Sequence, residues 1–175
     1  MPRVAAVLFI TMLAACGGRE RVTVVDPVAC DAPGLEVCRQ TGDIVFGSQP
    51  SPATLQYFKD QGFTTVVSTR GLAELEWDER ALVESLGMRF VQIPMENPVL
   101  GITDAQVAAL DSVLAAQEGP TLLHCSSGNR VAGLWGTWLA ERQGVDPTAA
   151  LRLAELAGMT RVRPVVEQRL SSASR

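Results

Sequence analysis

Short apolar runs alternate with longer mixed stretches along the chain from residue 42 onward. The apolar, β-branched runs predict strands within residues 42–50, 64–69, 88–94 and 121–125. The mixed stretches predict helices over residues 52–60, 74–87, 103–117, 129–144, 147–158 and 165–170. This alternation predicts an α/β fold, in which helices cover both faces of a central, mainly parallel sheet of four to five strands.

Two of the predicted helices carry clear start signals. Ser51 precedes Pro52, which combines a capping hydroxyl with the residue best suited to a first helical turn. Thr103 and Gln106 have the spacing of a capping box, in which the side chain of each residue accepts a hydrogen bond from the backbone N–H of the other. These signals fix where the helices predicted over 52–60 and 103–117 begin.

Length and charge limit the classes of protein that the chain can represent. It has 175 residues and 47% hydrophobic content, enough for one domain with a full core. The formal net charge is −4 and no long basic run is present, so a nucleic-acid partner is excluded. We identify no internal repeat.

The N-terminus has the pattern of an export signal. Arg3 precedes twelve mostly apolar residues (4–15), too few to span a hydrocarbon core, which needs about 20. The segment LAAC that ends at Cys16 resembles a bacterial lipobox. We therefore expect a signal peptide over 1–15, a lipidated tether and N-terminal segment over 16–41, and a folded domain over 42–175. The predicted location is exported and membrane-anchored by lipid at Cys16, in the periplasm, with the outer membrane favoured. An ordinary signal peptide with an incidental Cys16 is the alternative.

Export changes the interpretation of the other cysteines, because an oxidising compartment lets thiols pair. Cys30 and Cys38 flank a short loop with Pro33 and Gly34, and we expect a disulfide between them. The alternative is that both are small buried apolar residues. Cys125 then has no obvious partner, which indicates a free reactive thiol or an intermolecular bridge.

Cys125 lies where a predicted strand turns into a helix. Such a turn directs backbone N–H groups and the positive helix end toward one point, so it binds anions and favours a thiolate. Arg130 can donate two hydrogen bonds to an oxyanion there. We expect Cys125 to be a nucleophile, although a buried structural cysteine is the alternative. The expected substrate-binding residues are those that follow it: Ser126, Ser127, Gly128, Asn129 and Arg130.

The segment HCSSGNR (124–130) resembles the signature of protein tyrosine and dual-specificity phosphatases with one residue removed. The shorter spacing, Trp135 and the upstream segment 47–76 resemble more closely the bacterial beta-lactamase hydrolase-like phosphatase-like domains, a branch of that superfamily. The resemblance covers about residues 42–158. It implies a three-layer phosphatase-like sandwich and phosphomonoester hydrolysis through a cysteinyl phosphate at Cys125, with Arg130 and the loop amides holding the phosphate.

The resemblance also directs the search for a general acid, which lies in this superfamily on a loop about thirty residues before the cysteine. Glu96 has that place, and Asp104 in a first helical turn is its rival. His124 is the only histidine, so a histidine-built metal site is excluded, and we expect neither a metal nor a cofactor. We interpret Arg70 and Glu74 as a structural ion pair.

Three functions remain open at this point. The first is a lipid-anchored exported phosphatase acting on a phosphorylated small molecule or a phosphoprotein. The second is a rhodanese-like sulfurtransferase that carries a persulfide on Cys125, because such enzymes also use short cysteine loops. The third is a non-catalytic anion-binding lipoprotein.

Overall fold

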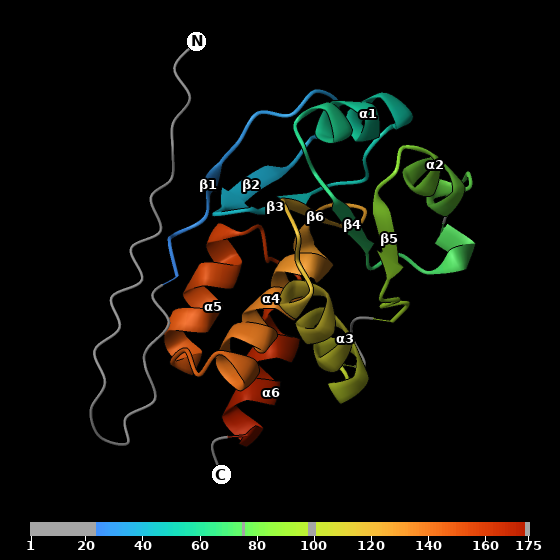
Figure 1. Cartoon of the computed structure of the whole chain (residues 1–175). Helices are drawn as coiled ribbons and strands as arrows, with labels where there is room; N and C mark the ends of the chain where they lie inside the picture. The colour runs from blue at the N-terminus through green and yellow to red at the C-terminus, as the bar shows by residue number, and fades with distance from the viewer. Residues whose placement is uncertain (1–23, 75, 98–100, 174–175) are drawn as a thin grey trace.

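A computed structural model describes residues 24–74, 76–97 and 101–173. These residues form one mixed six-stranded sheet in the order β1-β2-β3-β6-β4-β5 (Figure 1). The strands β3, β6, β4 and β5 are parallel to one another, whereas β2 pairs antiparallel with both β1 and β3 at one edge. The strands are β1 (Val28–Ala29), β2 (Cys38–Thr41), β3 (Ile44–Gly47), β4 (Thr65–Ser68), β5 (Arg89–Gln92) and β6 (Thr121–His124).

Helices cover both faces of the sheet, which confirms the predicted fold class (Figure 1). Two hydrophobic clusters fill the two spaces between sheet and helices; one includes residues of α1 and α2, the other residues of α3 to α6. The helices are α1 (Pro52–Asp60), α2 (Glu79–Ser85), α3 (Asp104–Ala115), α4 (Asn129–Arg142), α5 (Pro147–Leu156) and α6 (Arg163–Ala173), with a short 3-10 helix η1 (Leu72–Glu74).

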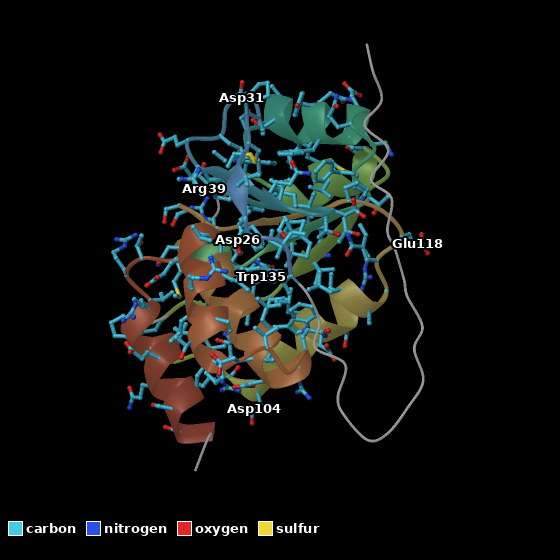
Figure 2. The ribbon with its side chains drawn as sticks, turned by 90° about the vertical axis from the view of Figure 1, so that its left-hand side faces the viewer. Asp26, Asp31, Arg39, Asp104, Glu118 and Trp135 are labelled. Atoms are coloured by element: carbon cyan, nitrogen blue, oxygen red, sulfur yellow. A yellow bond between two sulfur atoms is a disulfide. The ribbon has the colours of Figure 1, made fainter. Side chains whose placement is uncertain are left out.

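Trp135 of α4 lies in the core between the sheet and the helical layer (Figure 2). Its ring packs against that of Phe46 on β3, with the ring centroids 4.9 Å apart. Trp138 lies on the same helix, and its indole N–H donates to Asp111 of α3 at 2.8 Å. Both tryptophans therefore stabilise the packing of α4. This helix begins directly after residues 125–128, which we call the cysteine loop.

Both predicted helix starts are confirmed. The Ser51 hydroxyl accepts a hydrogen bond from Thr54 N, and Thr103 and Gln106 form a complete capping box. The helix predicted over 74–87 is wrong in its first turn, because α2 begins only after Asp78. The Asp78 carboxylate caps Ala81 N, so the chain enters the helix there.

The sheet has six strands instead of the predicted four to five, because β1 and β2 were not expected. The disulfide between Cys30 and Cys38 is present, as predicted, and Cys30 N donates to Cys38 O at 3.2 Å. The bridge thus joins β2 to the residue that follows β1. The predicted domain start at residue 42 falls between β2 and β3.

The predicted signal peptide and the lipidated Cys16 lie outside the described residues. Within the ranges that the structure describes, none of the helices has the length and apolar character needed to cross a membrane.

Candidate active site

The cysteine loop is anchored at the centre of the sheet. All four residues of β6 are buried, and β6 pairs with β3 on one side and β4 on the other. The next residue, Cys125, donates its N–H to Gly47 O at 3.4 Å, and Ser127 pairs with Ser48 in an isolated antiparallel bridge. Because two strands hold the start of the loop, its position relative to the sheet is fixed.

The loop turns into α4 at Gly128. This residue has φ +78° and is the N-cap of the helix, a left-handed conformation that glycine adopts without the strain of a Cβ atom. An added Cβ would lie 3.2 Å from Cγ1 of Val37. The glycine therefore permits both the turn and the close approach of the segment before β2.

The Cys125 thiol is free and fully buried, and it belongs to the hydrophobic cluster on the α3–α6 side. Arg130, on the first turn of α4, lies close enough to interact with it electrostatically. The pKa of Arg130 is raised above its ordinary value chiefly by its hydrogen bonds to Glu74, with a further contribution from its interaction with Cys125. The guanidinium thus lies near the sulfur, while the burial of the thiol is the feature that the alternative of a structural cysteine predicts.

Four groups hold Arg130 in this place. Its Nη1 and Nη2 donate to the two carboxylate oxygens of Glu74, each at 2.7 Å. Nη1 also donates to Met95 O at 3.0 Å and to Thr69 O at 3.4 Å, and Nη2 donates to the Ser126 hydroxyl at 3.3 Å. The hydrogen bond from Arg130 is the main reason that the pKa of Glu74 falls to about 2. The carboxylate is therefore ionised at neutral pH and keeps the guanidinium oriented.

The role of Glu74 was missed in the sequence. The expected pair with Arg70 is present, with 3.9 Å between Arg70 Nε and Glu74 Oε2, but the two short bonds from Arg130 are stronger. The two partners are 56 positions apart, so no local pattern marks them.

A pocket of about 460 Å³ opens beside Arg130. Glu96 lines it together with Ser126 and Ser127, whereas Cys125 and the rival Asp104 do not. Asp104 is exposed at the outer edge of the helical layer and pairs with Arg169 at 2.6 Å (Figure 2). The pocket is lined by Glu74, Glu96, Ser126, Ser127, Asn129, Arg130, Arg161, Val162, Pro164 and Val165.

Asn129 lines this pocket and also connects the cysteine loop to the segment between α5 and α6. Its side-chain Oδ1 accepts hydrogen bonds from Thr160 N at 2.7 Å, the Thr160 hydroxyl at 3.1 Å and Val162 N at 3.3 Å. The segment 160–163 is thereby held at the rim of the pocket. The sequence reasoning did not identify this segment.

His124 lies behind the loop and is fully buried. Its Nε2 lies 3.0 Å from Oε1 of Glu79, which is also buried, and Gln49 donates to the same oxygen at 3.1 Å. This contact fixes the end of β6 against the start of α2. No group of three or more histidine, cysteine, aspartate or glutamate side chains suited to a metal ion occurs among the described residues.

Fold and site together define the class: a strand–loop–helix turn with a cysteine beside an arginine, at the end of a central parallel strand, is the arrangement of the cysteine-dependent tyrosine phosphatase fold. Two solved structures with this fold resemble the chain. Tk-PTP in its active form matches with a TM-score of 0.62 at 19% identity, and the alignment covers 75% of this chain and 92% of the Tk-PTP chain. TpbA of P. aeruginosa in complex with pTyr matches with a TM-score of 0.63 at 21% identity, and the alignment covers 83% of this chain and 96% of the TpbA chain.

The chain belongs to the family of the phosphatase-like domain of beta-lactamase hydrolase-like proteins, whose sequence profile matches residues 36–141. A curated relative, the beta-lactamase hydrolase-like protein of Agrobacterium fabrum, is 28% identical over 106 residues. That alignment covers 58% of this chain but only 24% of the relative, so the chain matches about a quarter of its length.

Proposed function

We propose that this domain hydrolyses phosphate monoesters through a cysteinyl-phosphate intermediate. The observation that supports the proposal most directly is the placement of Arg130, which lies near Cys125, lines the pocket and is oriented by Glu74. A phosphate that enters the pocket and binds this guanidinium is brought close to Cys125, whose sulfur is buried and does not line the pocket, so the loop must move for the two to meet. The loop amides and the N-terminus of α4 add positive potential at the same point.

The chemistry follows in two steps. The Cys125 thiolate attacks phosphorus, an S–P bond forms, the ester P–O bond breaks, and the leaving alkoxide takes a proton from Glu96. Water then attacks phosphorus and loses a proton to Glu96, the S–P bond breaks, and phosphate leaves with the thiolate restored. Arg130 stabilises the oxygens of phosphorus in both steps. Ser126, Ser127, Gly128 and Asn129 stay predicted substrate-binding residues.

The substrate we propose is a phosphorylated small molecule or phosphoprotein. The structure of TpbA contains pTyr, and an aryl phosphate is accordingly the first compound to test on this chain.

The test is turnover of 4-nitrophenyl phosphate by the mature domain. Cys125→Ser should abolish turnover, and Arg130→Lys should lower kcat about 10²- to 10³-fold, because a point charge replaces a fork of donors. Vanadate should inhibit the wild type. Thermal unfolding of both variants serves as the control for folding.

Two results would contradict the proposal. Turnover that persists in Cys125→Ser would exclude the cysteine as nucleophile. Cyanide-dependent formation of thiocyanate from thiosulfate, without aryl phosphate turnover, would identify a sulfurtransferase.

We further propose export and lipid anchoring at Cys16, a hypothesis that rests on the sequence pattern of residues 1–16. Expressed in full length, the wild type should sediment with membranes and incorporate labelled palmitate. Cys16→Ser should lose the label and leave the membrane fraction. Equal labelling of the two proteins would exclude this anchor.

A further inference from the structure

Arg161 lines the same pocket as Arg130 and differs from it in one respect. Arg130 is paired with Glu74, whereas the exposed Arg161 side chain makes no hydrogen bond or ion pair with any described residue. The neighbouring arginine Arg163 also differs, because its guanidinium is paired with Glu155 and Glu167. Arg161 is therefore a cation at the pocket rim whose charge the described part of the chain leaves uncompensated.

The backbone on both sides of Arg161 is fixed to the cysteine loop. Asn129, the residue next to Arg130, accepts hydrogen bonds from the backbone N–H groups of Thr160 and Val162. Val162 also packs closely on α4, where a Cβ added to Gly133 would lie 2.6 Å from its Cγ2. The base of the Arg161 side chain thus has a set position relative to the phosphate site, while its guanidinium is free to meet a ligand.

The wall beside Arg161 is apolar. Val162, Pro164 and Val165 line the pocket there. A ligand that fills the pocket outward from Arg130 would place an apolar body against these side chains and its far end near Arg161.

We propose that Arg161 determines specificity, and that the pocket takes aryl phosphates that carry a second anionic group, a carboxylate or another phosphate, at the end remote from the ester. This inference rests on the proposed function, because it assigns the phosphate to Arg130. The second anion pairs with the guanidinium of Arg161, and the aromatic ring covers the apolar wall. Glu74 has no part in this second contact, because it is engaged by Arg130.

The experiment measures binding, so that it does not depend on turnover. Cys125→Ser protein is titrated calorimetrically with benzylphosphonates that carry a para substituent ending in a carboxylate, its neutral carboxamide or a second phosphonate, each on linkers of increasing length. At the best linker length, the carboxylate should bind about threefold to tenfold tighter than the carboxamide, the gain of one partly exposed ion pair. The second phosphonate, compared with the carboxylate, tells which anion the rim prefers.

Arg161→Gln should abolish this preference, and Arg161→Glu should reverse it. Arg163→Gln is the matched control, since it removes a neighbouring guanidinium that does not line the pocket, and it should keep the wild-type preference. A preference below twofold at every linker length, or one that survives Arg161→Gln, would overturn the inference.

The result also separates this inference from the proposed function. Anion preference at Arg161 without turnover of aryl phosphates by the wild type would retain the binding site and reject the hydrolase. Turnover without anion preference would retain the hydrolase and reject the role of Arg161. If none of the phosphonates binds, the role of Arg161 is rejected, and the turnover assay alone decides whether the domain is a hydrolase.

Discussion

Arg130 combines two demands that oppose each other at the scale of a single residue. It must be held in one orientation beside Cys125, and it must still offer donors to a phosphate. Glu74 meets the first demand with two hydrogen bonds of 2.7 Å. Nε of Arg130 takes no part in the hydrogen bonds to Glu74. Nη2 donates to the Ser126 hydroxyl as well as to Glu74. An incoming dianion can therefore bind a guanidinium that is already oriented, which lowers the entropic cost of binding.

The Glu74 carboxylate should make folding stability depend on pH in acid. Its pKa is about 2 in the folded protein and 4.5 ordinarily, so the stabilisation is complete above pH 4.5 and is lost as the pH falls toward 2. After a discount for its partial exposure, we expect the loss to be about 1–2 kcal/mol. Urea unfolding of wild type and Glu74→Gln from pH 2 to 8 measures it.

The difference in the free energy of unfolding between wild type and Glu74→Gln should be constant from pH 6 to 8, where Glu74 is ionised in both the folded and the unfolded state. This difference should shrink below pH 4.5. A difference that stays constant down to pH 2 would show that the carboxylate charge contributes nothing to stability.

At the scale of secondary-structure elements, local signals in the sequence were sufficient for most boundaries. Ser51 and the pair Thr103 and Gln106 mark helix starts that the structure reproduces, because capping depends on residues within one turn. The cysteine loop was also predictable, since an apolar strand, small residues and an arginine follow one another directly. The strand β2, with sequence CRQT, lacks an apolar pattern and was missed.

The contacts that build the site around this loop could not be predicted from local patterns. Glu74 reaches Arg130 across 56 positions, and Asn129 reaches Thr160 across 31. Both contacts exist because the fold places η1, which follows β4, and the segment before α6 beside the loop. The hydrophobic periodicity of the sequence does not indicate which polar side chains then come into contact. A carboxylate such as Glu74 has the same local appearance whether it faces solvent or an arginine.

At the scale of the whole molecule, the segment before β3 supports the cysteine loop from outside. The Ser48 hydroxyl accepts hydrogen bonds from the backbone N–H groups of Glu36 and Val37, at 3.0 and 3.3 Å, and Val37 packs against Gly128. The disulfide between Cys30 and Cys38 closes this segment into a loop. The edge of the sheet and the cysteine loop are thus joined through a covalently closed segment.

Reduction of the disulfide should therefore destabilise the domain. For a bridge that spans a sequence separation of 8, the loss of chain entropy in the unfolded state corresponds to about 2–3 kcal/mol, or a fall in Tm of about 5–10 °C for a domain of this size. The measurement compares Tm with and without dithiothreitol in the Cys125→Ser background, so that the reductant acts on the bridge alone within the described part of the chain. The Cys30→Ser/Cys38→Ser variant of that background should melt at the reduced temperature under both conditions. An equal Tm for the oxidised and reduced protein would mean that hydrogen bonding through Ser48 holds the segment without the bridge.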